Sequence, residues 1–140
     1  MSSRPLNDHL SHLLSQAHRH FMRQLNADGV SLDQWRVMKS LSERRGMAMR
    51  AIADDLSLNP PTLTKIVDRL VQDGFVYRAP DSSDRRKIYV FLSDSGAELL
   101  TTLSTHVDRC EAQAEDIFGN EDADKLKSML EDFVRQMSNR

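Results

Sequence analysis

The chain has 140 residues, of which 39% are hydrophobic, which is enough for one globular domain with a buried core. This composition excludes wholesale disorder, and no apolar run approaches the roughly 20 residues that span a bilayer. The first residues lack the unbroken apolar stretch of a secretory signal, and a single cysteine, Cys110, excludes an internal disulfide framework. We therefore expect a cytoplasmic protein with no membrane partner.

Charge is distributed unevenly along the sequence, although the formal net charge is only −2. Between Arg36 and Lys87, eleven basic residues outnumber seven acidic ones, so this segment carries +4 and the two flanks together carry −6. A locally basic segment favours contact with phosphates whatever the sum over the whole chain. The same residues would also suit ordinary solvated faces, so charge alone does not decide.

Helical periodicity dominates the first part of the chain. Apolar residues at three- and four-residue spacings predict an amphipathic helix from Leu6 to Leu25, which ends at Asp28-Gly29. A capping box of Ser31 and Gln34 begins a second helix, which stops at Gly46.

Two shorter helices follow on either side of a turn. The first is predicted from about Arg50 to Leu56, and the turn Ser57–Pro61 separates it from a helix over about Pro61–Gln72. Asn59 or Pro60 precedes that helix, and Gly74 supplies its left-handed cap.

After Gly74 the apolar period changes from 3.6 to 2, which predicts strands over 75–78 and 88–92 joined by a polar loop. Ser93 then begins a long helix that ends near Gly119, and a last helix carries apolar residues from Ala123 to Met137.

The order of helices, turn, helix and hairpin between Ser31 and Leu92 predicts a winged helix-turn-helix, so the fold is mostly α with a small β-hairpin wing. The flanking helices carry apolar stripes that one small winged domain would not cover, which indicates association. We expect three parts: an N-terminal dimerisation helix (1–30), a winged helix-turn-helix DNA-binding domain (31–92) and C-terminal dimerisation helices (93–140). Packing of the flanking helices within one chain is the alternative.

The helix after the turn has two distinct faces. Its apolar stripe, which should face the core, consists of Leu63, Ile66, Val67 and Leu70. Its other side offers donors, acceptors and cations suited to a major groove, from Thr62, Thr64, Lys65, Asp68, Arg69 and Gln72. A plain amphipathic surface helix would have the same pattern.

The hairpin tip favours the DNA interpretation. Arg85 and Arg86 would gain little for folding there, because exposed ion pairs contribute roughly 0–1 kcal/mol. A guanidinium suits a narrow, electronegative minor groove, and Asp84 could hold the side chain before DNA arrives. A solubilising turn is the alternative.

These segments together resemble the MarR family of transcription regulators. The resemblance lies in an ordered set of motifs: Ile52-Ala53-Asp54-Asp55-Leu56, Thr62 to Leu70, Gly74-Phe75-Val76-Tyr77-Arg78, Asp84-Arg85-Arg86 and Leu92-Ser93-Asp94-Ser95-Gly96. The flanking helices also suit that family.

The resemblance implies a role for each matching residue. The major groove would receive Thr62, Thr64, Lys65 and Arg69 from the recognition helix. Arg86 would enter the minor groove from the wing, held by Asp84, with Arg85 as a second candidate. The sequence departs from the family pattern at Pro61, which removes a possible phosphate contact, and at Ser93, which caps a helix about as well as threonine.

The resemblance further implies a homodimer on double-stranded operator DNA, paired through its terminal helices. The operator would be pseudo-palindromic, with half-sites roughly 10 bp apart or a multiple of that. Repression, with release by a small aromatic or amphipathic acid, is the family expectation. Position makes Trp35, Met38, His106 and Arg109 candidates for the effector site, although ordinary core and surface roles suit each of them.

Other classes of function have less support. The sequence has no phosphate loop, metalloprotease motif or nucleophile elbow, so we expect no enzymatic activity and no cofactor. Cys110 lies in an apolar stripe, which favours an inert thiol, and the five histidines have no recognisable metal-ligand spacing. A winged helix that binds a protein partner is the remaining alternative.

Overall fold

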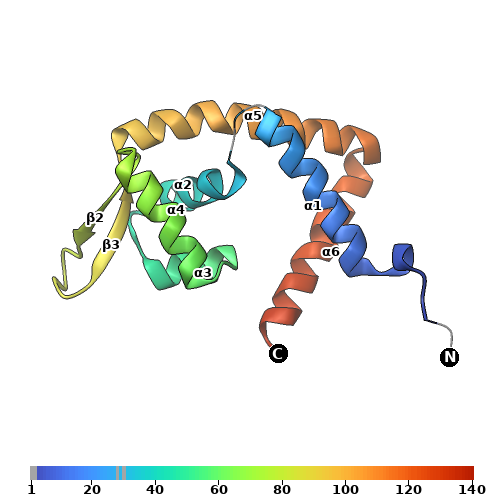
Figure 1. Ribbon diagram of the computed structural model, residues 1–140, viewed down its shortest axis with the longest axis horizontal. Coiled ribbons are helices and arrows are strands. Elements are labelled where there is room, and N and C mark those ends of the chain that lie inside the picture. Colours follow the sequence, from blue (N-terminus) through green and yellow to red (C-terminus); the bar gives the residue numbers. More distant parts are fainter. Residues whose placement is uncertain (1–2, 28, 30) are drawn as a thin grey trace. The chain divides into compact units, whose positions relative to one another are not determined.

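The computed structural model describes residues 3–27, 29 and 31–140, and the chain divides into two compact units, Met1–His106 and Val107–Arg140. In chain order the elements are η1 (Leu6–Asp8, a 3-10 turn), α1 (Leu10–Ala27), α2 (Leu32–Glu43), β1 (Met47–Ala48), α3 (Met49–Leu56), α4 (Pro60–Gln72), β2 (Val76–Pro80), β3 (Ile88–Leu92), α5 (Asp94–Phe118) and α6 (Asn120–Ser138). Figure 1 shows the hairpin β2–β3 projecting beside α4. The predicted fold, mostly α with a small β wing, is confirmed.

Side-chain caps begin three of the helices at or near the predicted residues. Ser31, Asn59 and Ser93 each accept a hydrogen bond from the backbone N–H three residues later, at 3.3, 2.9 and 3.0 Å. Each cap satisfies a backbone donor that has no partner within the helix. Asn59 therefore starts α4 at Pro60, one residue earlier than predicted.

The first helix differs from the prediction at its beginning. Leu6–Asp8 forms a 3-10 turn, and His9 is extended, with φ −89° and ψ 122°, so α1 starts only after it. The ring Nδ1 of His9 lies 3.0 Å from the carbonyl oxygen of Pro5, a local contact that apolar periodicity does not reveal. At the other end α1 stops at Ala27, and Asp28 of the predicted stop lies outside the described residues.

The sheet has three antiparallel strands in the order β1-β3-β2. The sequence did not predict β1, because two residues are too few to show a period; Met47 pairs with Val90 there. β2 runs from Val76 to Pro80 rather than over 75–78. Phe75 stays outside it because its N–H donates to Leu70 O at 2.9 Å, which closes α4.

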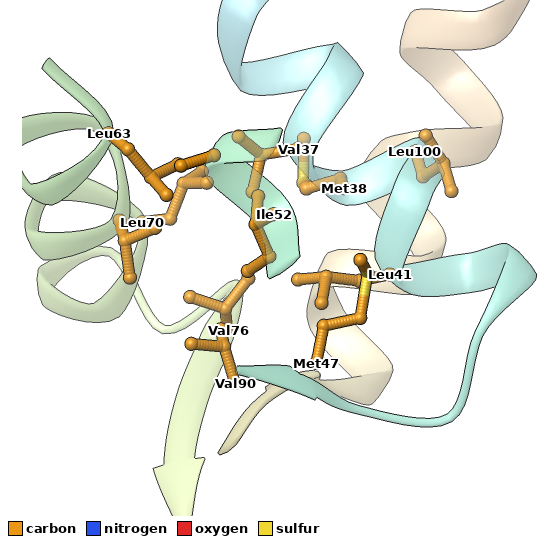
Figure 2. Packing of buried hydrophobic residues seen from close by; sticks show 12 residues of the cluster. Val37, Met38, Leu41, Met47, Ile52, Leu63, Leu70, Val76, Val90 and Leu100 are labelled. Carbon is orange, nitrogen blue, oxygen red and sulfur yellow. The ribbon is translucent and has the colours of Figure 1, made fainter. Parts of the chain in front are cut away.

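The core of the first unit lies between the short helices and the sheet (Figure 2). Its buried members are Val37, Met38, Leu41, Met47, Ile52, Ala53, Leu63, Val67, Leu70, Val76, Val90 and Leu100. Three members of the stripe predicted for α4 are at most 1% exposed, and the fourth, Ile66, is partly buried against the same core. One face of α4 is thereby fixed inward, which turns the opposite face to solvent.

Two glycines fix the start of α5 against the base of the wing. Gly74 has φ +79°, which confirms the predicted left-handed cap of α4. Ser93 Oγ donates to Gly74 O at 2.7 Å, and Ser93 N donates to Phe75 O at 3.1 Å. A Cβ at Gly96 would lie 2.0 Å from Phe75 O, so only glycine permits this approach of the two backbones.

The second unit consists of the end of α5 and of α6. Cys110 and Ala123 are buried, whereas much of the apolar surface of α6 is exposed. Lys127 Nζ lies 2.7 Å from Glu115 Oε1, and the carboxylate that accepts this hydrogen bond raises the pKa of Lys127. Across the described residues, no helix combines the length and the apolar character needed to cross a membrane.

Candidate nucleic-acid interface

Helix α4 presents a continuous polar face to solvent. Thr62, Thr64, Lys65 and Arg69, the four residues predicted to contact the major groove, are all exposed. They lie opposite the buried stripe, because the periodicity of the helix separates the two sets. The structure therefore brings together on one exposed surface the four α4 residues that the sequence assigned to the major groove.

Two of these side chains already have partners in their own helix. Thr64 Oγ1 donates to Pro60 O at 2.9 Å, which leaves the hydroxyl oxygen available only as an acceptor. Arg69 Nε donates to Asp73 Oδ2 at 3.1 Å, and the Arg69 side chain is 66% exposed. An ion pair so exposed is weak, so a phosphate can replace the carboxylate.

The wing loop between β2 and β3 is closed by its own hydrogen bonds. Asp81 N donates to Lys87 O at 2.8 Å, and Lys87 N donates to Asp84 O at 3.0 Å. Arg86 N donates to Asp84 Oδ1 at 3.1 Å, so the tip has a defined backbone conformation.

The side chains at the tip form a forked ion pair. Arg86 Nε and Nη2 donate to the two carboxylate oxygens of Asp84 at 3.1 and 3.3 Å. These bonds from Arg86, through its side chain first and its backbone second, lower the pKa of Asp84 below its ordinary value of 3.8. The side chain of Arg86 remains 90% exposed, and Arg85 beside it is exposed as well. The guanidinium is thus oriented by the protein and accessible from solvent.

A contact that the sequence did not predict links the wing to α4. Arg78 on β2 donates through Nη2 to Asp68 Oδ1 on α4 at 2.6 Å. The two residues are ten apart in different elements, so neither helical nor strand periodicity indicates the pair.

Ion pairs involve about half of the basic residues in the segment that the sequence identified as locally basic. Six basic residues between Arg36 and Lys87 have an acidic partner: Arg36, Lys39, Arg44, Arg69, Arg78 and Arg86. Arg36 has a second, structural task, because its Nη2 donates to Leu56 O at 2.6 Å at the end of α3. The DNA-binding candidates are therefore distinguished by their place on the polar face of α4 and at the wing tip, and not by charge alone.

The four candidate effector residues occupy different environments. Trp35 is half-buried and its Nε1 donates to Ser104 Oγ at 3.1 Å, whereas Met38 is fully buried in the core. His106 is half-buried in the first unit, and Arg109 is exposed in the second.

A cavity of about 430 Å³ opens between α3 and the start of α4, and none of these four residues lines it. Its lining is formed by Met49, Arg50, Ala53, Asp54, Leu58, Pro60, Leu63 and Thr64.

Metal ligands do not gather in the part of the chain that the structure describes. No group of three or more histidine, cysteine, aspartate or glutamate side chains is placed there to hold an ion. Cys110 is buried, with 3% of its surface exposed.

Comparison with known proteins also indicates a DNA-binding transcription regulator. Residues 30–88 match the model of the MarR family. The chain is 29% identical over 126 residues to the HTH-type transcriptional regulator FarR of Neisseria gonorrhoeae, covering 87% of this chain and 86% of FarR. It is also 29% identical over 133 residues to the homoprotocatechuate degradative operon repressor of Escherichia coli, covering 92% of this chain and 90% of the repressor.

A solved structure has the same fold over nearly its whole length. NadR, crystallised in complex with 4-hydroxyphenylacetate, superposes with a TM-score of 0.77 at 26% identity, covering 95% of this chain and 97% of NadR. The matched residues 30–88 include α4 and the tip of the wing. Residues 30–88 are therefore a MarR family domain, and the chain as a whole is similar to winged helix-turn-helix, DNA-binding transcription regulators.

Proposed function

We propose that this chain is a homodimeric repressor that binds a pseudo-palindromic operator and leaves it when a small aromatic acid binds. We expect it to have no catalytic activity of its own. The observation that carries the proposal is the Arg86 guanidinium, which Asp84 holds at the exposed tip of a wing joined to α4.

α4 and the wing tip contact different grooves of the DNA because their shapes differ. α4 is a helix with one polar face, which suits the width of the major groove, and its Thr62, Thr64, Lys65 and Arg69 contact bases and phosphates there. The wing tip is narrow and cationic, so Arg86, with Arg85 beside it, enters the minor groove.

Exposed apolar side chains support the dimer. In the second unit, Ile117, Met129, Val134 and Met137 are each more than half exposed. Apolar residues grouped in this way usually mark an interface. We assign residues 1–30 and 93–140 to dimerisation and residues 31–92 to DNA binding.

The class of effector is suggested by two relatives. One is named as the repressor of an operon that degrades homoprotocatechuate, a dihydroxyphenylacetate, and the other was crystallised with 4-hydroxyphenylacetate. A hydroxylated phenylacetate is therefore the first effector to test. The residues to substitute are Trp35, Met38, His106 and Arg109.

The test begins with selection of genomic fragments by the purified protein, followed by measurement of mass and affinity on the enriched duplex. We expect an inverted repeat bound by two copies of the chain, with release on addition of 4-hydroxyphenylacetate or its dihydroxy analogue. Protein that is monomeric at micromolar concentration would contradict the dimer. Binding that no aromatic acid weakens would contradict the effector class while leaving operator recognition intact.

A further inference from the structure

Asp68, the acidic residue of the Asp68–Arg78 ion pair, lies on the helix that carries the major-groove candidates. Asp68 lies beside Arg69 and three residues after Lys65, on the polar face of α4, and its side chain is 59% exposed. A carboxylate on a surface that approaches DNA repels phosphates. Considered by charge alone, Asp68 should weaken the binding of DNA.

The partner of Asp68 lies in another element. Arg78, whose side chain is 35% exposed, belongs to β2, and its Nη2 lies 2.6 Å from Asp68 Oδ1. By contrast, the other acidic residue at the end of this helix, Asp73, pairs with Arg69 four residues before it in the chain. Asp68 therefore makes a contact between two elements, whereas the contact of Asp73 stays local.

Arg78 is connected to the wing tip through continuous hydrogen bonding. Its strand pairs with β3 in a fixed register, with Arg78 opposite Val90 and Pro80 opposite Ile88. Beyond Pro80 the loop is closed by the bond from Asp81 N to Lys87 O and by the bonds from Arg86 to Asp84. A constraint on Arg78 is thus transmitted to the position of Arg86.

We propose that the Asp68–Arg78 ion pair sets the position of the wing relative to α4, which makes Asp68 a positioning residue for DNA recognition. With the pair intact, the major-groove contacts of α4 and the minor-groove contact of Arg86 form on the same DNA without further adjustment. The proposal rests on the proposed function, because it requires that Arg86 contacts DNA.

The sign of one substitution separates positioning from simple electrostatics. Asp68→Asn removes a negative charge from the DNA-facing surface, so charge alone predicts tighter binding. Positioning predicts the opposite: about threefold to tenfold weaker binding to the selected operator, with binding to random duplex unchanged or tighter. Asp73→Asn is the comparison, because it makes the same charge change at the C-cap of α4, where it breaks the local pair with Arg69 and leaves the Asp68–Arg78 pair in place. It should leave operator affinity unchanged or raise it.

A double-mutant cycle with Arg86→Ala supplies a readout that a merely structural role would not change. In the wild-type background Arg86→Ala should cost affinity, and in the Asp68→Asn background the same substitution should cost much less, because the wing is no longer held in position relative to α4. In the Asp73→Asn background the full cost should remain. Asp68→Glu, which keeps the charge, should restore part of the coupling.

The possible results distinguish a failure of the wing contact from a failure of the positioning role of Asp68. If Arg86→Ala costs nothing in the wild type, the proposed function fails at the wing. If it costs the same in the wild type and in Asp68→Asn, or if Asp68→Asn binds the operator more tightly, the positioning role is overturned while the wing contact stands. Melting curves of all variants are compared first, and because Asp68 is exposed we expect them to coincide.

Discussion

Asp84 and Arg86, two residues apart at the tip of the wing, form a forked ion pair in which both carboxylate oxygens accept from one guanidinium, at 3.1 and 3.3 Å. Arg86 is nonetheless 90% exposed. The pair therefore contributes little to stability, and its consequence is that the guanidinium has a fixed orientation before any ligand arrives.

Arg86→Ala is expected to weaken operator binding by about 1–3 kcal/mol, the size of a good groove contact. The melting temperature and the mass of the dimer should not change, because the side chain lies in solvent. Titration of a labelled operator measures the loss, and Arg85→Ala, which removes the same charge one residue away, tests the second candidate at the tip for comparison. Equal losses for the two variants would show that only charge matters at the tip.

The pKa of Asp84 offers a check on the ion pair without DNA. The bonds from Arg86 lower this pKa below 3.8, so the carboxylate stays ionised, and the pair intact, at all higher pH. The stabilisation is lost only as the pH falls through the lowered pKa. Carboxyl-carbon NMR titration should place the Asp84 midpoint below 3.8 in the wild type and higher in Arg86→Ala. A midpoint that Arg86→Ala does not move would mean that the pair is not formed in solution.

Substitutions on α4 should divide into two classes. Lys65→Ala and Arg69→Ala remove cations, so each should weaken binding to many sequences and reduce the slope of affinity against salt by about one. Thr62→Ala and Thr64→Ala remove polar contacts without charge, so they should alter base preference and leave that slope alone. Parallel selections and salt titrations of the four variants provide the comparison. A changed salt slope for the threonine variants would contradict the assignment.

Gly96 should be intolerant of any side chain. A Cβ there would lie 2.0 Å from Phe75 O, a backbone atom that cannot move aside cheaply. We expect Gly96→Ala to destabilise the protein by about 1–3 kcal/mol, as overpacking of a well-packed site does. Gly119→Ala is the comparison, because no atom lies within 4 Å of a Cβ there and only the positive φ of +80° opposes it. Thermal unfolding that ranks Gly119→Ala as the more damaging change would contradict this packing.

Local sequence signals predicted most of the fold because each acts over a few residues. The caps at Ser31, Asn59 and Ser93 and the stripe on α4 depend on spacings of three or four residues. β1 was missed because its two residues join the sheet only through pairing with β3, and pairing between distant segments has no local pattern.

The features of the candidate site that depend on neighbouring residues were also predicted from the sequence, whereas a contact between separate elements was not. The polar face of α4 and the Asp84–Arg86 pair are local, and both were found. The Asp68–Arg78 contact depends on how the wing folds back on α4, so it is visible only in the structure.

The most direct test of the central claim is the affinity of the wild-type protein for its selected inverted repeat, measured against salt beside a scrambled duplex of equal length. Recognition by α4 and the wing predicts a steep fall in affinity with salt on both duplexes, together with a preference for the repeat of roughly a thousandfold or more. Binding that is insensitive to salt, or equal on the two duplexes, would contradict the claim and favour a winged helix that binds a protein partner.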